Sequence, residues 1–409
     1  MKRHRIFAIA AIAVAMSAML PASAAAATKP VVMPRAGATS VTVGNTLRLT
    51  GSVVITVSPA AGPWADVACS HDFTLGLRKD GTLWAWGYNG DGQLGLGNNA
   101  RRLRPTRVGR SRHWAAVSCG NNYTLATRQS GTLWAWGNNY HGQLGLGDTT
   151  KRLVPTRVGN ADDWAAVACA NDFTLALRKD GTLWAWGFNG EGQLGLGDTS
   201  DRPVPTQVGT VADWTTVVGG ASDTLALRAD GTLWAWGEND KGQLGLGDTT
   251  NRLVPTQVGN ADDWAAVACA NDFTLALRKD GTMWAWGFNG GGQLGLGDRG
   301  DRHVPTQVGM AIDWTAVSCG ASHTLGVKRG GTLWAWGWNA SGQLGLGNVK
   351  DKLTPTRVGR ARDWAAVACA GNHTLAVKTG GSLWAWGDNG KGQLGLGDVI
   401  GRHSPTQVQ

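Results

Sequence analysis

Apolar and polar residues alternate with a period of two over short stretches of this chain. Residues 174–177 (TLAL) and 183–187 (LWAWG) show this alternation, and no stretch shows the spacing of an amphipathic helix. Such stretches predict short β-strands, and the Asp180-Gly181 pair between them is typical of a tight β-hairpin turn. The pattern therefore predicts an all-β protein.

The same pattern returns every 50 residues from Trp64 onward, without insertion or deletion. In the copy at 164–213, strands are predicted at 164–169, 174–178, 182–186 and near 205–208. A proline begins each predicted fourth strand and places it at an outer edge, because proline cannot donate to a neighbouring strand. Four-stranded antiparallel blades repeated seven times close into a ring, so the sequence predicts a seven-bladed β-propeller. The predicted blades are 64–113, 114–163, 164–213, 214–263, 264–313, 314–363 and 364–409.

The chain begins like an exported protein. Lys2, Arg3 and Arg5 precede an apolar run and a small-residue stretch, which is typical of a secretory signal peptide at 1–27, cut after Ala24 or Ala27. A retained anchor is the alternative. Cleavage removes three of the charges behind the net charge of +9, and the modest remainder does not favour nucleic acid as a partner. Only 16% of residues are charged, which excludes a charged disordered chain, and no later apolar run is long enough to span a membrane. We expect a secreted protein, either extracellular, periplasmic or at the cell surface.

Residues 28–63 differ in composition from the repeats. Val and Thr alternate at 40–43 and 53–57, which predicts a β-rich segment that caps the ring, adds a strand to a blade or acts as a spacer. Each copy runs from a first to a fourth strand, so the repeats show no strand exchange that would close the ring. This N-terminal segment is the one candidate for supplying such a strand.

The loop sequence WAWGxNxxGQLGLGD, followed by PTxV and preceded by the TLAL strand, resembles the repeat of the regulator of chromosome condensation family in all seven copies. The resemblance implies the propeller fold. The family's founding member is a nuclear exchange factor for the small GTPase Ran that also binds chromatin. This chain departs from that pattern through its export signal, its lack of a blade insertion and its lack of a basic arm after the signal. In fold, compartment and blade count it is similar to the exported bacterial β-lactamase inhibitor of propeller type, whose shorter repeats lack the full loop.

Two sets of repeated residues are interpreted as structural. Trp84 and Trp86 point to one side of the third strand and are predicted to pack in the core, while the Asn89-type residues and GQLGLG segments are predicted to form turns. An even number of cysteines in an exported chain favours disulfides, but equivalent positions around a ring need not approach closely enough, so we predict small buried residues near the axis. The cysteines are Cys69, Cys119, Cys169, Cys269, Cys319 and Cys369, with Gly219 in the fourth copy.

The sequence predicts neither a metal site nor a cofactor site, because it has no CxxC motif and no paired histidine ligands. The eight histidines are scattered and no nucleophile motif accompanies them, so we predict no enzyme activity. The basic run at 101–113, together with Arg357, Arg360 and Arg362, is interpreted as solvated charge on the rim, with an anionic polymer or membrane as the alternative.

The candidate binding site is the face that carries the turns between first and second strands and the loops between third and fourth strands. Aromatic residues exposed on one rigid face are typical anchors of a protein interface. Those in the loops are Tyr88, Tyr140, Phe188, Phe288 and Trp338, and those before the TL pair are Phe73, Tyr123, Phe173 and Phe273. For the second group, the alternative is that the rings only plug the central channel.

Three functional hypotheses follow in order of weight. The first is an exported, monomeric, non-enzymatic scaffold that recognises a protein partner through these aromatics. The second is a multivalent glycan or cell-envelope binder with sugars stacked on the same rings, which the nearly identical copies at 164–213 and 264–313 favour. The third is an enzyme or a nucleotide exchange factor. The identity of the partner is not predicted.

Overall fold

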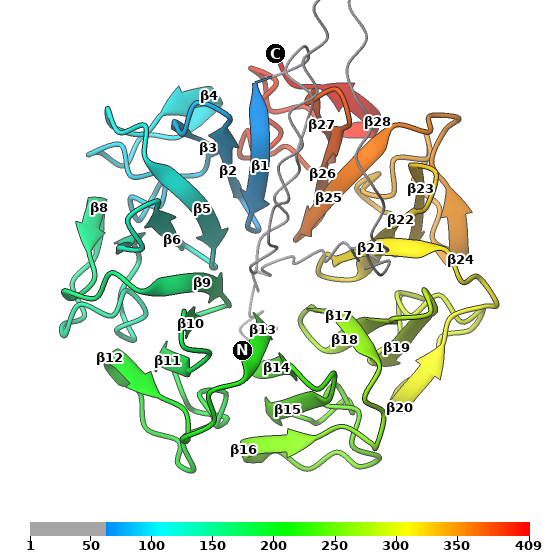
Figure 1. Ribbon diagram of the computed structural model, residues 1–409. Helices are drawn as coiled ribbons and strands as arrows, with labels where there is room; N and C mark the ends of the chain where they lie inside the picture. The colour runs from blue at the N-terminus through cyan, green and yellow to red at the C-terminus, as the bar shows by residue number, and fades with distance from the viewer. Residues whose placement is uncertain (1–62) are drawn as a thin grey trace, which may run out of the picture.

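Seven four-stranded antiparallel sheets form a ring in the computed structural model, which describes residues 63–409 (Figure 1). The predicted all-β, seven-bladed propeller is confirmed, and each blade is built from one copy of the repeat. Within a blade the strands run in chain order from the ring axis outward, and we call them A, B, C and D. The predicted signal peptide at 1–27 and the β-rich segment at 28–63 lie outside the described residues, except for Pro63.

The strand bounds repeat from blade to blade. Blades 1 to 3 contain β1 (Trp64–Cys69), β2 (Phe73–Arg78), β3 (Leu83–Gly87), β4 (Arg102–Arg107); β5 (Trp114–Cys119), β6 (Tyr123–Arg128), β7 (Leu133–Gly137), β8 (Arg152–Arg157); β9 (Trp164–Cys169), β10 (Phe173–Arg178), β11 (Leu183–Gly187) and β12 (Arg202–Gln207). Blades 4 and 5 contain β13 (Trp214–Gly219), β14 (Asp223–Arg228), β15 (Leu233–Gly237), β16 (Arg252–Gln257); β17 (Trp264–Cys269), β18 (Phe273–Arg278), β19 (Met283–Gly287) and β20 (Arg302–Gln307). Blades 6 and 7 contain β21 (Trp314–Cys319), β22 (His323–Lys328), β23 (Thr332–Gly337), β24 (Lys352–Arg357); β25 (Trp364–Ala370), β26 (His373–Lys378), β27 (Leu383–Gly387) and β28 (Arg402–Gln407).

The prediction for the fourth strand was wrong in its start. Strand β12 begins at Arg202, so Pro205 lies inside the strand and not at its first residue. The register of β11 and β12 shifts between the pairs Ala185–Thr206 and Gly187–Arg202, which marks a bulge around the proline. Proline is tolerated at such a bulge in an outer strand because its missing N–H interrupts no regular ladder there. The outer position that the proline predicted is confirmed.

The core lies between neighbouring blades. One cluster, for example, packs Tyr123 and Leu125 of blade 2 against Val167 and Trp186 of blade 3. Trp86 and its counterparts in strand C are fully buried, as predicted for core residues. Trp84 also packs against the core, as predicted, but it is only half-buried and is covered by the Arg78 guanidinium, which lies 4.0 Å from the ring centroid. Apolar burial between blades is therefore the main source of stability of the ring.

The GQLGLG segment of each C–D loop joins one blade to the next. The carbonyl of Gln143 in blade 2 accepts hydrogen bonds from Thr174 Oγ1 (2.8 Å) and Trp186 Nε1 (2.9 Å) in blade 3. The same pair of bonds occurs at all seven joints, with acceptors Gln93, Gln143, Gln193, Gln243, Gln293, Gln343 and Gln393. Each pair lies in the buried space between blades, where an unpaired carbonyl would be costly.

The ring closes through this loop. Gln393 of blade 7 accepts from Thr74 Oγ1 and Trp86 Nε1 of blade 1, both at 2.9 Å, and Figure 1 shows these two blades side by side. Among the described residues, each sheet contains only the strands of its own copy. Closure therefore needs no strand exchange between repeats.

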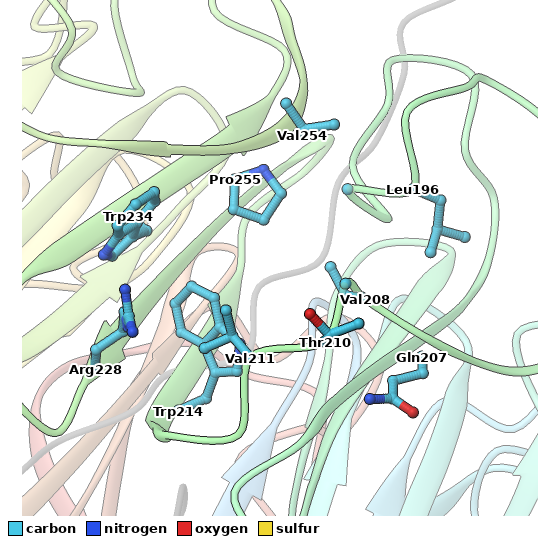
Figure 2. Close-up of a pocket in the computed structure, with 12 residues that line it drawn as sticks. Leu196, Gln207, Val208, Thr210, Val211, Trp214, Arg228, Trp234, Val254 and Pro255 are labelled. Carbon is cyan, nitrogen blue, oxygen red and sulfur yellow. The ribbon is translucent and has the colours of Figure 1, made fainter.

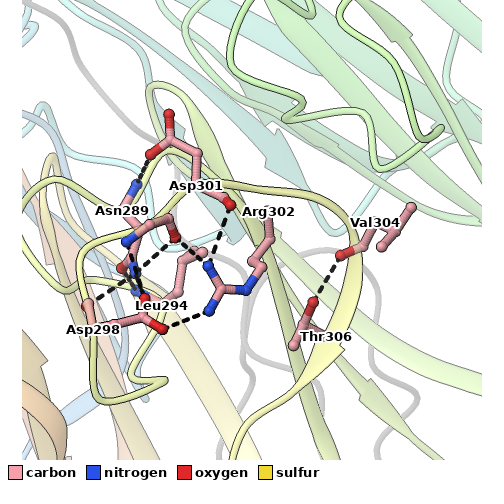
Figure 3. Close-up of polar contacts among 8 residues, drawn as sticks. Asn289, Leu294, Asp298, Asp301, Arg302, Val304 and Thr306 are labelled. Atoms are coloured by element: carbon pink, nitrogen blue, oxygen red, sulfur yellow. Dashed lines mark hydrogen bonds and ion pairs between the residues drawn. The ribbon is translucent and has the colours of Figure 1, made fainter.

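The Asn of the C–D loop organises the turn, as the sequence predicted. Asn289 Nδ2 donates to the carbonyls of Asp298 and Gly300, and its Oδ1 accepts from the Leu294 N–H at 3.0 Å (Figure 3). Arg302 pairs with Asp298 at 2.6 Å and holds the far end of the same loop. Residues 63–409 contain no helix that is long and apolar enough to cross a membrane.

Candidate functional site

The A–B turns and C–D loops lie together on one face, which we call the loop face. Within blade 3, the Phe188 N–H that starts the C–D loop donates to the Asp172 carbonyl of the A–B turn at 2.9 Å. On the opposite face, the Lys179 N–H of the B–C turn donates to the Asp163 carbonyl of the preceding D–A link at 2.9 Å. These bonds confirm the predicted division of the loops between the two faces.

The loop aromatics of the predicted site lie on this face with part of their surface exposed. The side chain of Tyr140 is 72% exposed, whereas Tyr88, Phe188, Phe288 and Trp338 are half-buried.

Two of these rings are held in place by a neighbouring blade. The ring of Phe188 packs edge-on against His141 of the preceding blade, with centroids 4.8 Å apart, and Lys391 Nζ lies 5.8 Å from the centroid of the Tyr88 ring. These contacts restrict the orientation of the Phe188 and Tyr88 rings in the absence of any partner.

The second aromatic group of the prediction is placed differently. Phe73, Tyr123, Phe173 and Phe273 are at most 1% exposed, because they start strand B and pack against the next blade. The Tyr123 hydroxyl donates to the Phe173 carbonyl, which ties blade 2 to blade 3. These side chains offer no free surface, so only the loop aromatics of the predicted site can contact a partner.

Blade 4 breaks the repeat at this same position. It carries Asp223 where the other blades have an aromatic ring or a histidine, and it carries Glu238 where most have an aromatic ring. Asp223 is 1% exposed, and neither of its carboxylate oxygens has a hydrogen-bond partner. Burial raises its pKa well above the usual value, and the nearby carboxylates of Glu238 and Asp272 raise it further.

The neighbours of Asp223 are perturbed in the same direction. Burial, reinforced by Asp240 and Asp272, raises the pKa of Glu238 to about 7. Burial, reinforced by Asp240, raises the pKa of Asp272 to about 6. We call Asp223, Glu238, Asp240 and Asp272 the acidic sector. The sequence showed Asp223 and Glu238 as departures from the repeat, but it gave no reason to place them beside Asp272 of the next blade.

The rim also has hollows between blades. A hollow of about 480 Å³ between blades 3 and 4 is lined by Leu196, Val208, Trp214, Trp234 and Arg228 among others (Figure 2). An equivalent hollow of about 410 Å³ lies between blades 2 and 3. In each blade a basic side chain lies against two tryptophans, as Arg178 does against Trp164 and Trp184, with 4.9 and 4.0 Å to the centroids.

Family models match most of the chain. The model of the RCC1-like domain matches residues 42–325, and the model of the regulator of chromosome condensation repeat matches 330–377 and 380–409. The chain belongs to the regulator of chromosome condensation family. The family resemblance that the loop motif indicated is thereby confirmed.

Solved structures of other proteins have the same fold as this chain. Human WBSCR16 is 22% identical with a TM-score of 0.73, and the match covers 80% of this chain and 94% of that one. Prp20p from Saccharomyces cerevisiae, solved in a study of its binding to Gsp1p and histones, is 23% identical with a TM-score of 0.72, covering 83% and 88%. Yeast RCC1 (Prp20) with Kap60 bound is 20% identical with a TM-score of 0.73, covering 90% and 91%. Likeness at this level shows a common fold.

The six cysteines of this family member are buried and free, as predicted for small buried residues. Burial raises the pKa of the Cys169 thiol to about 12, so it stays protonated at neutral pH. In blade 4, Gly219 takes the cysteine position, where a Cβ would lie 2.5 Å from Ala170 Cβ. Among the described residues, no three His, Cys, Asp or Glu side chains are grouped so that they could hold a metal ion.

Proposed function

We propose that this chain is an exported, non-enzymatic scaffold that binds a protein partner through its loop face. The observation that carries the proposal is the placement of Tyr140, Phe188, Phe288 and Trp338 on one face, with Tyr140 72% exposed. Aromatic side chains with few rotatable bonds supply large contact area at a small entropic cost, and they dominate the energetics of protein interfaces. Export rests on the signal-like residues 1–27.

Two further observations support protein binding. The half-buried rings sit on a closed ring of sheets, so their positions are fixed before a partner arrives and little ordering cost remains. The relatives of known structure include a yeast propeller studied for binding to Gsp1p and histones, and the same protein with Kap60 bound. Protein recognition is therefore a use to which this fold is put elsewhere in the family.

The test compares a triple variant of the loop face and a double control variant with the parent chain. In the first, Tyr140, Phe188 and Trp338 on the loop face are changed to Ala. In the matched control, Met310 and Ile312, which are 94% and 64% exposed on the opposite face, are changed to Ala. Each purified mature chain is used to capture proteins from the envelope and culture medium of the source organism, after circular dichroism has shown that its melting temperature is unchanged.

We expect one protein, captured in stoichiometric amount by the parent and the control, to be lost with the loop-face variant. Loss of two or three aromatic anchors commonly weakens an interface by a hundredfold or more, at about 2 kcal/mol or more for each anchor. Equal capture by all three chains would overturn the proposal.

The nearly identical copies at 164–213 and 264–313 favour a second candidate function. They present Phe188 and Phe288 in the same loop context, as a multivalent glycan binder would. A glycan array probed with the parent and with the loop-face variant tests this alternative, and glycan binding without a protein partner would favour it over the first.

A further inference from the structure

We propose that a hollow on the face opposite the loop face binds an organic phosphate monoester, with its phosphate group on Arg128. We call this face, which carries the B–C turns and the D–A links, the link face. The inference goes beyond the proposed function, because the site lies away from the loop face and does not depend on protein binding. It is carried by the hollow and by the loss, in blade 2, of both carboxylates that accompany the equivalent arginine in blades 3 to 5.

In blades 3 to 5, two carboxylates accompany the arginine that ends strand B. In blade 4, Arg228 Nε and Nη2 each donate a hydrogen bond of 2.8 Å to Asp213 of the D–A link. Asp230 of the B–C turn adds a second negative charge, and both acids raise the pKa of Arg228. The equivalent groups are Arg178 with Asp163 and Asp180 in blade 3, and Arg278 with Asp263 and Asp280 in blade 5. The protein itself thus balances the charge of these guanidinium groups.

Blade 2 keeps the arginine and loses both acids. His113 stands at the position of Asp213, and Ser130 stands at the position of Asp230. Arg128 Nε is buried without a hydrogen-bond partner, and burial lowers the pKa of Arg128, with no acid among the described residues to offset the effect. Blades 1, 6 and 7 keep one of the two acids each, namely Asp80, Asp313 and Asp363. The charge of Arg128 is therefore left for a ligand to balance.

The guanidinium of Arg128 is held ready for an acceptor. Its central carbon lies 3.8 Å from the centroid of the Trp134 ring and 4.9 Å from that of the Trp114 ring. These contacts stabilise the cation and restrict its orientation. The N–H groups of arginine lie in the plane of the guanidinium, so an anion can approach them in that plane, as Asp213 approaches Arg228 in blade 4.

The hollow makes this cation accessible. Arg128 is half-buried and lines a hollow of about 590 Å³ that spans blades 2 to 4. Arg178 and Lys179 also line it, and none of its lining residues among 63–409 is acidic. Lys179 reaches from blade 3 to the B–C turn of blade 2, since a Cβ placed on Gly131 would lie 3.3 Å from Lys179 Nζ. Within the described residues Lys179 Nζ forms no ion pair and donates to the Asp162 carbonyl at 3.5 Å. A ligand in the hollow can therefore meet two cations from neighbouring blades.

The D–A link that leads into blade 2 adds positive charge beside the hollow. Arg110 and Arg112 of this link are exposed. The His113 carbonyl at its end accepts from the N–H of Gln129 at 2.9 Å, and Gln129 lines the hollow. Asp80 of blade 1 offsets part of the charge through Arg112. The remaining positive charge favours the approach of an anion.

The missing charge and the arginine geometry favour a phosphate monoester. Two carboxylates are absent from blade 2, and a phosphate monoester carries about 1.5 to 2 negative charges at neutral pH, whereas a carboxylate or a sulfate ester carries one. Arginine donates two parallel hydrogen bonds to phosphate oxygens, and a nearby lysine adds a point charge. Arg128 and Lys179 are therefore suited to a phosphate group.

The rest of the hollow suits an organic group attached to that phosphate. Besides its charged residues, the lining contains Trp164, Ala165 and Leu177. The volume lies within the range of small-molecule sites, which are mostly apolar with a few polar groups that fix the orientation of the ligand. We expect an organic ester to bind more tightly than inorganic phosphate, because its organic part would cover this apolar surface.

The test is a calorimetric titration of the purified mature chain with phenyl phosphate, at low ionic strength and about pH 8, where the ester carries two charges. Phenyl sulfate, which carries one charge, and inorganic phosphate, which has no organic part, are titrated in parallel. The first variant is Arg128→Gln. Its matched control is Arg228→Gln, which changes the equivalent arginine of blade 4 that already has an acid partner.

A second pair of variants adds charge instead of removing it. His113→Asp with Ser130→Asp restores beside Arg128 the two acids that blades 3 to 5 carry, so the restored acids should compete with the ligand. The control is Thr149→Asp with Thr249→Asp, which adds two acids at exposed positions of the C–D loops. Melting temperatures show that each variant is folded, and the acid-restoring variant still tests the site if Arg128→Gln does not fold.

We expect phenyl phosphate to bind the parent and both controls alike, and to bind Arg128→Gln and the acid-restoring variant at least about tenfold more weakly. Phenyl sulfate and inorganic phosphate should both bind the parent more weakly than phenyl phosphate does. The proposal is overturned if phenyl phosphate does not bind the parent at millimolar concentration, or if each variant and its control weaken binding equally. Equal affinity for phenyl sulfate would show that the site does not select a doubly charged phosphate, and equal affinity for inorganic phosphate would show that the hollow does not hold the organic part.

Discussion

Removing the two donors to the Gln393 carbonyl is expected to open the ring between blades 7 and 1. The variant Thr74→Val with Trp86→Phe eliminates hydrogen bonds of 2.9 Å each. Two buried neutral hydrogen bonds contribute about 2 kcal/mol together, and the carbonyl left without a donor costs about 1–3 kcal/mol more. The joint should therefore weaken by roughly 3–5 kcal/mol, which is a large part of the stability of a typical domain.

The matched control removes the same donors at an internal joint. Thr224→Val with Trp236→Phe deprives the Gln193 carbonyl of bonds of 2.8 and 2.9 Å. Blades 3 and 4 remain joined there by the D–A link between β12 and β13, whereas the described residues contain no such covalent link between blades 7 and 1. Local opening should thus be easier at the closing joint.

Native-state hydrogen exchange measures the opening. The Gly397 N–H donates to the Leu103 carbonyl across the closing joint at 2.8 Å, and the Gly197 N–H donates to the Leu253 carbonyl across the internal one at 2.9 Å. In the closing-joint variant we expect the protection of the Gly397 N–H against exchange to fall by about 100-fold or more, while the protection of the Gly197 N–H stays unchanged. Equal loss of protection at the two joints in their respective variants would refute the reasoning, because the covalent link would then contribute nothing.

Three further predictions concern stability and reactivity. Burial raises the pKa of Asp66 from 3.8 to about 7, so the stability that depends on its neutral form is complete below about pH 4 and is lost as the pH rises through 7. Between pH 4 and pH 8 the free energy of unfolding of Asp66→Ala, measured in urea, should therefore rise relative to that of the parent by up to about 4 kcal/mol. Gly195→Ala should lower the melting temperature far more than Gly209→Ala. Both glycines have positive φ, but only a Cβ on residue 195 would clash, at 2.7 Å from Trp236 Nε1. Equal drops in melting temperature would show that φ alone determines the cost. Cys169 and the other buried thiols should react with a disulfide reagent only at the rate of unfolding, and rapid labelling of the native chain would contradict the burial.

The sequence predicted the blades because their signals are local. The period of two and the Asp-Gly turn specify strands within one copy, and the first strand at 164–169 agrees with β9 to the residue. Neither the period of two nor a turn motif marks the start of the fourth strand, so its first residue could not be predicted. Of residues 202–204 only Arg202 pairs with the neighbouring strand, on the far side of the register shift, and none of the three is buried, so no alternation of buried and exposed positions marks the start of β12.

The candidate site was predicted only in part, because its geometry depends on contacts between copies. The exposure of Tyr140 follows from its place in a polar loop. Phe73 looks similar in sequence, yet it is buried because the start of strand B faces the next blade. Asp223 and Asp272 are 49 residues apart in the sequence, and the effect of Asp272 on the pKa of Asp223 depends on the packing of blade 4 on blade 5.

Within residues 63–409 the ring closes through a loop and each sheet contains only the strands of one copy, so one structural repeat corresponds to one sequence repeat. A recombination event that adds or deletes 50 codons in phase adds or removes a whole sheet, and every remaining strand keeps its partners. The new neighbours meet through the same glutamine carbonyl, threonine and tryptophan, because these residues recur at every joint. The nearly identical copies at 164–213 and 264–313 are what an in-phase duplication leaves behind, and each added copy carries the residues that form the joints on both of its sides.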